Sequence, residues 1–175
     1  MRYHNITKDD MLNGDGLRVV LWVSGCSHCC KECQNPVTWD PNSGILFDES
    51  AKQEIFEQLE KAYISGITFS GGDPLYVQNI SEVTKLAKEI KEKYPTKTIW
   101  LYTGSTWEQI QTMKLMKYVD VLVDGEFEVD KVLLSIGRAA DLGCLGKLAD
   151  QIKTERGKIV VDDTMKTSVD NIYAC

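Results

Sequence analysis

The most constraining feature of this chain is a group of four cysteines, Cys26, Cys29, Cys30 and Cys33, which follows an apolar segment. They lie in a short polar stretch, residues 25–35, which we call the Cys loop. Such a loop offers no apolar surroundings in which a free thiol could pack as a small hydrophobic residue. We therefore interpret the four thiols as a chemical site, with a disulfide pair, a zinc site and an iron–sulfur cluster as the alternatives.

The start of the chain is polar and lacks the apolar core of a signal peptide, so we expect a cytoplasmic, reducing environment, which disfavours disulfides. A zinc site stays open as an alternative, with Cys26, Cys29 or His28, Cys30 and Cys33 as ligands. It is less favoured because structural zinc sites usually take two Cys-x-x-Cys pairs set well apart, whereas these pairs abut.

The third interpretation groups Cys26, Cys30 and Cys33 as a Cys-x3-Cys-x2-Cys set. Three thiolates can hold a cubane of four irons and leave one iron without a protein ligand, whereas an electron-transfer cluster normally takes four. That open iron is what a reactive cluster needs. In this interpretation Cys29 is idle and His28 is a solvated histidine.

Several short segments around the Cys loop carry a family resemblance. They are Asn13 to Gly16, Val23 to Cys26, Asn35, Thr38 with Trp39, Asn42 to Gly44, and Ser70 to Pro74. A Cys-x3-Cys-x2-Cys loop after a strand resembles the radical S-adenosylmethionine (SAM) superfamily. Over about residues 1–127 the surroundings resemble the activating component of the anaerobic ribonucleoside-triphosphate reductase.

The resemblance implies two cofactors, a 4Fe-4S cluster on three cysteines and SAM bound at the open iron. It implies SAM contacts from residues beside the third cysteine and from the segment Ser70 to Pro74, which we call the glycine turn; these are Glu32, Cys33, Gln34, Gly71, Gly72 and Asp73. The family commonly has aromatic residues where this chain has Glu32 and Gln34. Trp39 is either a substitute platform for adenine or part of the core.

The implied reaction is reductive cleavage of SAM to methionine and a 5′-deoxyadenosyl radical, which takes a hydrogen atom from a glycine of the large reductase subunit. The implied partners are that subunit and a low-potential donor such as flavodoxin or ferredoxin. Alternatives are an activator of another glycyl-radical enzyme, such as a formate-lyase, and a non-catalytic zinc-binding module or inactive chimera. No acid or base is needed, so His4, His28 and Asp124 receive no catalytic role.

Charge and hydropathy argue against two other partners. The net charge is −6 and Lys and Arg form no cluster, which disfavours nucleic acid and anionic membrane surfaces. The longest apolar run, Val19 to Val23, is far too short to span a bilayer.

Apolar segments alternate with amphipathic ones, which predicts an α/β fold with a mostly parallel sheet. The predicted strands are Leu17–Val23, Gly66–Ser70, Thr98–Tyr102 and Val119–Val123. The first predicted helix begins at Asp48 or Ser50 and has Tyr63 on its buried face. The second begins at Ile80, and the third at a Ser105/Glu108 capping box. These units are too few for a closed eight-stranded barrel, so we expect a partial, open (β/α) barrel. The Cys loop and the glycine turn both follow strands and should meet at one rim.

We assign residues 1–129 to a radical SAM domain and residues 130–175 to an atypical, irregular C-terminal segment. Ser135–Gly143 and Gly157–Cys175 resemble a late part of thioredoxin reductase-type flavoproteins, which would make this segment a fused fragment. The chain contains no Gly-x-Gly-x-x-Gly motif, so a dinucleotide site is not supported. Short strands are predicted at Ile159–Val161 and Ile172–Tyr173.

Overall fold

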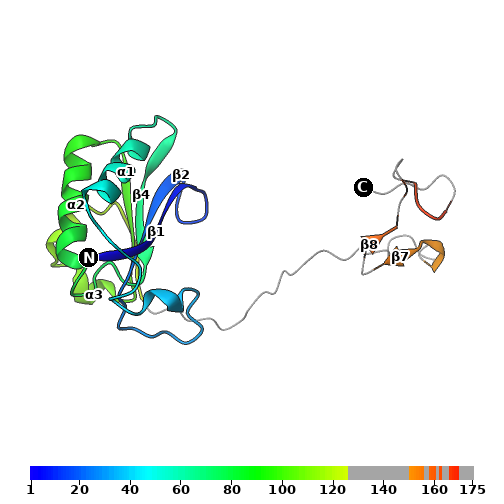
Figure 1. The fold of residues 1–175 in the computed structure, drawn as a ribbon, viewed down its shortest axis with the longest axis horizontal. Coiled ribbons are helices and arrows are strands. Elements are labelled where there is room, and N and C mark those ends of the chain that lie inside the picture. Colours follow the sequence, from blue (N-terminus) through cyan, green and yellow to red (C-terminus); the bar gives the residue numbers. More distant parts are fainter. Residues whose placement is uncertain (126–149, 156–157, 161, 163–165, 170–175) are drawn as a thin grey trace. The chain divides into compact units, whose positions relative to one another are not determined.

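The computed structural model describes residues 1–125, 150–155, 158–160, 162 and 166–169 (Figure 1). It consists of two compact units, Met1–Val129 and Asp130–Cys175. Each unit is described by itself. In the described residues, no helix has both the length and the apolar character needed to cross a membrane.

The first unit is built on a mixed, mostly parallel sheet, as predicted. Among the described residues the sheet has six strands in the order β3-β1-β2-β4-β5-β6. They are β1 (Arg2–Asp10), β2 (Leu17–Val23), β3 (Ile45–Leu46), β4 (Ile64–Gly71), β5 (Thr98–Tyr102) and β6 (Val121–Val123). Strands β2, β4, β5 and β6 run parallel, and β1 is antiparallel to both β2 and β3.

The structure corrects the prediction at the start of the chain, where the polar segment before Leu17 forms strand β1. Only Ile6 of this strand is fully buried. The strand pairs with β2, and its Thr7 hydroxyl accepts a hydrogen bond of 2.8 Å from the indole nitrogen of Trp22. A strand near the edge of a sheet can expose polar side chains, so its sequence lacks the apolar run that marks β2.

The helices are α1 (Glu49–Leu59), α2 (Ile80–Lys93) and the short α3 (Trp107–Ile110), with 3-10 turns η1 (Pro36–Thr38) and η2 (Lys114–Lys117). Asp48 caps α1 by accepting a 3.0 Å hydrogen bond from the Ala51 amide. The capping box of α3 lies one residue later than predicted, at Thr106 and Gln109, because Thr106 is the residue with extended backbone. Tyr63 lies beyond the end of α1 and is exposed.

One face of the sheet packs under α1 and α2, which lie on the same side of it (Figure 1). Alternate residues of the strands point to this face, as the two-residue period of a strand requires. Together with the helices they form the apolar core: Val19, Leu21, Val23, Ile67, Phe69, Ile99, Leu101, Ile55, Leu59, Val83, Leu86, Ala87 and Ile90. This burial is the main stabilising contribution to the unit.

The other face carries Arg18, which is completely buried. Its guanidinium donates to Thr68 Oγ1 at 2.9 Å, to Thr98 Oγ1 at 2.9 Å, and to the carbonyls of Asp15, Ile67 and Thr98 at 2.8–3.1 Å. It also lies 5.3 Å from the ring centre of Trp100. This arginine therefore connects three strands on the face that the helices do not cover.

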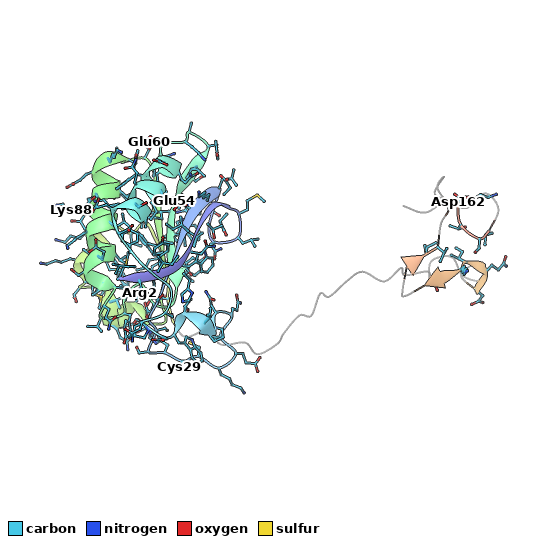
Figure 2. All side chains as sticks on the ribbon, viewed as in Figure 1. Arg2, Cys29, Glu54, Glu60, Lys88 and Asp162 are labelled. Atoms are coloured by element: carbon cyan, nitrogen blue, oxygen red, sulfur yellow. The ribbon has the colours of Figure 1, made fainter. Side chains whose placement is uncertain are left out.

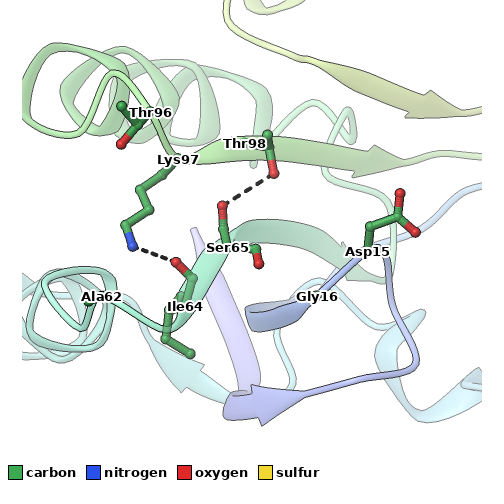
Figure 3. Close-up of a pocket in the computed structure, with 8 residues that line it drawn as sticks. All are labelled: Asp15, Gly16, Ala62, Ile64, Ser65, Thr96, Lys97 and Thr98. Carbon is green, nitrogen blue, oxygen red and sulfur yellow. Dashed lines mark hydrogen bonds between the residues drawn. The ribbon is translucent and has the colours of Figure 1, made fainter.

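At the amino ends of the strands a cavity of about 470 Å³ lies beside this network (Figure 3). Lys97 reaches across it and donates to the Ile64 carbonyl, and the Thr98 hydroxyl donates to the Ser65 carbonyl at 3.4 Å. Lys97 also donates to the Lys61 carbonyl at 2.9 Å. This end of the sheet is thus fastened by side chains that bond to backbone carbonyls.

The described residues of the second unit contain two short strands. These are β7 (Thr154–Glu155) and β8 (Lys158–Ile159), which pair antiparallel. The predicted strand Ile159–Val161 overlaps β8 at Ile159 alone. The predicted strand Ile172–Tyr173 lies outside the described residues.

The arginine network predicts a stability effect. Arg18→Met should lower the free energy of unfolding of the full chain by on the order of 3 kcal/mol, because buried hydroxyl and carbonyl groups lose their donors. Urea unfolding followed by circular dichroism measures it. Lys85→Met is the control, since its side chain is 66% exposed and its replacement should change stability by less than about 0.5 kcal/mol. Equal stability of the two variants would contradict the structural role of Arg18.

Candidate radical SAM site

A cavity of about 440 Å³ opens at the carboxyl ends of the parallel strands. Every loop that follows one of these strands contributes to it: Cys26 after β2, Gly72 after β4, Thr103 after β5 and Asp124 after β6. Parallel strands present their carboxyl ends at one edge, where ligands of such sheets bind. The sheet face opposite the helices extends into the same cavity through Trp22, Ser70, Tyr102 and Val123.

Three of the four thiols of the Cys loop line this cavity. Cys26, Cys30 and Cys33 are half-buried there. Cys29 is exposed (Figure 2) and is not among the lining residues. Cys29 has a φ of +49° and Glu32 a φ of +62°, in a region that residues other than glycine seldom adopt. The loop therefore turns at these two residues, and of the residues next to them His28, Cys30 and Cys33 line the cavity.

The predicted SAM contacts divide in the same way. Gln34, Gly71, Gly72 and Asp73 line the cavity with Cys33, but Glu32 does not and its side chain is exposed. Asn35 and Trp39 also line it. The indole nitrogen of Trp39 is buried and has no partner among the described residues, so a donor in the cavity wall remains for a ligand.

The glycine turn approaches the Cys loop at backbone distance. The Gly72 amide donates to Val23 O at 2.8 Å, and the Asp73 amide donates to Gly25 O at 2.7 Å. A Cβ atom on Gly72 would lie 2.5 Å from Gly25 O and 2.9 Å from Thr38 O. Only glycine fits between these two carbonyl oxygens, which is the physical reason for a glycine at position 72 of the glycine turn.

Asn79, which the sequence analysis did not single out, fastens the two loops at their base. Its buried side-chain amide donates to Ser24 O at 2.7 Å and to Asp73 O at 3.0 Å. It also stands at the N-cap of α2, although its side chain makes no capping hydrogen bond. No sequence pattern marks this role, because the two carbonyls are 49 residues apart and meet only in the folded sheet.

The structure corrects the prediction that His28 is solvated. Its side chain is only 20% exposed, and its Nε2 lies 2.6 Å from Asp73 Oδ2, whose carboxylate is 5% exposed. The Thr103 hydroxyl, also missed by sequence reasoning, donates to the same carboxylate at 2.9 Å. The position of Thr103 directly after β5 was the available signal, because polar residues after parallel strands collect at one rim.

The surroundings of the thiols affect their protonation. Burial raises the pKa of the Cys26 thiol, and the nearby Asp73 acts in the same direction, while a backbone hydrogen bond from His28 lowers it. Burial also raises the pKa of Tyr102, and the positive charge of nearby Arg18 partly offsets this increase. Metal binding to Cys26 would therefore displace the proton that burial favours on this thiol.

The donor set fits an iron–sulfur cluster. Soft thiolates are the ligands of such clusters, and three of them face one cavity beside an orphaned donor. In the part of the chain that the structure describes, no three His, Cys, Asp or Glu side chains gather closely enough to hold a single metal ion.

Comparison with known proteins identifies the family. Residues 12–137 match a family described as a 4Fe-4S single cluster domain. The anaerobic ribonucleoside-triphosphate reductase-activating protein of Enterobacteria phage T4 is 43% identical over 141 residues, which are 81% of this chain and 90% of that protein. The chain belongs to the anaerobic ribonucleoside-triphosphate reductase-activating proteins.

Bacterial members of this family show similar identities. The activating protein of Escherichia coli K12 is 40% identical over 134 residues, or 74% of this chain and 87% of that protein. The activating protein of Haemophilus influenzae is 38% identical over 131 residues, or 73% of this chain and 84% of that protein. Activating enzymes of this reductase with a 4Fe-4S domain are radical SAM enzymes, so the cofactors are a 4Fe-4S cluster and SAM.

The close approach of the two loops predicts the effect of one added methyl group. Gly72→Ala should lower the free energy of unfolding by about 1–3 kcal/mol, because its Cβ would push the glycine turn away from Gly25 and Thr38. It should also lower the iron bound per chain after anaerobic reconstitution. Ser70→Ala, in the same turn, adds no atom and serves as control. Unchanged stability and iron content in Gly72→Ala would show that the two loops are not packed this closely.

Proposed function

We propose that this activating protein cleaves SAM reductively and thereby generates a glycyl radical on the anaerobic ribonucleotide reductase. The observation that supports this most directly is the shared cavity. In a chain of this family, Cys26, Cys30 and Cys33 face the same cavity as Gly71 and Gly72. When bound, the reduced cluster supplies one electron to the SAM sulfonium, whose carbon–sulfur bond breaks to give methionine and a 5′-deoxyadenosyl radical.

The roles that we assign to this chain's residues follow from their positions. Cys26, Cys30 and Cys33 hold the cluster. The Gly72 amide is already bonded to the end of β2 and the Asp73 amide to the Cys loop, so the glycine turn offers carbonyl oxygens, which suit the amino group of SAM.

The adenosine end of SAM then lies among the remaining residues that line the cavity. Trp39 offers a buried indole N–H, and Gln34 lies at the mouth of the cavity with an exposed side chain. Glu32 would contact SAM only if the cofactors draw the Cys loop inward.

We assign the cluster and SAM to a radical SAM domain of residues 1–129, arranged as a partial, open (β/α) barrel. Helices on one sheet face and a cavity on the other support this arrangement. All proposed site residues belong to the first unit. Residues 130–175 are then an attached segment with no role in the chemistry, and a flavoprotein-like origin for it stays a proposal.

The partner is the large subunit of the anaerobic ribonucleotide reductase, since that is the protein after which the relatives are named. We propose that a low-potential donor such as flavodoxin or ferredoxin delivers the electron in the cytoplasm. A net charge of −6 supports a protein partner rather than nucleic acid or an anionic membrane.

Anaerobic reconstitution tests the ligand set. The wild-type chain and Cys29→Ser should bind about four irons with matching sulfide, whereas Cys26→Ser, Cys30→Ser and Cys33→Ser should lose the cluster. With a strong reductant and SAM, the first two proteins should form 5′-deoxyadenosine and the other three should not. One zinc per chain with no SAM cleavage would instead support the zinc-binding module.

The identity of the activated enzyme needs its own measurement. A glycyl radical signal in electron paramagnetic resonance (EPR) should appear on purified anaerobic ribonucleotide reductase after incubation with the reconstituted chain, SAM and reductant. Formate-lyase serves as the comparison. A signal on formate-lyase alone would assign the chain to the other activators.

The unusual carboxylate at Glu32 predicts a change in reduction potential. A negative charge beside the cluster disfavours an added electron, so Glu32→Gln should have a higher potential than the wild type. The change should be small, because Glu32 is exposed and water screens its charge. Redox titration of the EPR signal measures it, with Glu54→Gln on α1 as control. An equal or lower potential in Glu32→Gln would contradict the prediction.

A further inference from the structure

The side chains of His28, Asp73 and Thr103 form a hydrogen-bonded chain across the rim of the cavity. His28 lies on the Cys loop after β2, Asp73 on the glycine turn after β4, and Thr103 directly after β5. His28 Nε2 donates to Asp73 Oδ2 at 2.6 Å, since a carboxylate oxygen accepts. Three loops that are far apart in the sequence are thereby joined.

The carboxylate of Asp73 is fully engaged by the protein. Its Oδ1 accepts from the Leu75 amide at 2.8 Å and from Thr103 Oγ1 at 2.9 Å, and its Oδ2 accepts from His28 and, at 3.1 Å, from Thr103. At 5% exposure it lies out of the solvent. Its position suits a structural hub better than a direct ligand of a substrate, because a buried carboxylate that gave up these donors would be left uncompensated.

The histidine ring has little room to move. A Cβ atom on Gly104 would lie 2.6 Å from two ring carbons of His28, so the ring packs directly against the backbone that follows Thr103. Among the described residues, the bond from His28 is the one side-chain hydrogen bond that joins residues 27–32 to another element. Asn79 and the backbone bonds hold only the base of the Cys loop.

We propose that His28, Asp73 and Thr103 form a latch that fixes the distance between the Cys loop and the glycine turn, so that one SAM molecule can span the cluster and the turn. The proposal rests on the proposed function and adds positioning residues to it. His28 and Thr103 act through Asp73 and need not touch SAM. The latch sets the loops in place before SAM binds, so its loss should weaken SAM binding while the three thiols still hold the cluster.

Three substitutions open the latch in different ways. His28→Leu removes one donor, Thr103→Val removes the other at nearly constant shape, and Gly104→Ala displaces the ring without removing any polar group. His28→Gln and Thr103→Ser keep a donor at each position and serve as matched controls. A shared effect of the first three variants, absent from the two controls, would single out the hydrogen-bonded chain itself.

The first measurement is SAM affinity, read from the change that SAM causes in the EPR spectrum of the reduced cluster. The three disruptive variants should bind about the wild-type amount of iron but bind SAM about tenfold more weakly. The two controls should stay within about threefold of the wild type. In turnover, KM for SAM should rise more than kcat falls.

The second measurement uses the metal-free full chain and does not depend on the proposed function. Amide hydrogen exchange at Cys33, Asp73 and Leu75, whose amides are hydrogen-bonded in the joined loops, should be several-fold faster in the disruptive variants than in the wild type and the controls. Unchanged exchange, or wild-type SAM affinity in His28→Leu and Gly104→Ala, would overturn the latch. Loss of iron together with SAM binding would overturn it as well, because His28 would then support the cluster.

A wild-type chain that assembles the cluster but neither binds nor cleaves SAM would overturn the proposed function, while hydrogen exchange still decides whether the latch exists.

Discussion

The parallel pairing of β2 with β4 is the constraint on which the site depends. The two strands pair in register up to their last residues, Val23 and Gly71, so the Cys loop and the glycine turn leave the sheet at the same level. Backbone bonds then continue beyond the strands, from Gly72 to Val23 and from Asp73 to Gly25. The thiols and the glycines are therefore held by the same hydrogen-bonding pattern that builds the sheet, and their separation is set by the spacing of neighbouring strands.

The two faces of the sheet have different tasks. The face under α1 and α2 is uniformly apolar, and its burial supplies most of the stability. The opposite face carries Arg18 and Thr68 at one end and Trp22, Ser70 and Tyr102 toward the cavity. Because alternate residues of each strand face opposite sides, the chain can vary the cavity face without disturbing the core.

The conformation of the Cys loop decides which thiols can serve the cofactor. Cys29 and Glu32 both have positive φ values, and each costs on the order of 1 kcal/mol relative to ordinary backbone. This geometry leaves Cys29 exposed while Cys26, Cys30 and Cys33 line the cavity. The strain lies beside the proposed ligands, where cluster binding can compensate for it. Such strain is typical of functional loops that the surrounding structure holds in place.

The sequence by itself determined the cysteine spacing, the mostly parallel α/β order, and the expectation that two strand-end loops meet at one rim, because these depend on local patterns and on the handedness of β-α-β units. Strand β1 was not predicted from the sequence, since a polar strand near an edge has no apolar run. The capping box of α3 was predicted one residue too early. Only the tertiary structure decided that His28 bonds to Asp73, that Asn79 joins the two loops, and that Glu32 does not line the cavity. The reason is physical: each of these depends on side chains brought together from different strand ends, and their distances are fixed only when the sheet has formed.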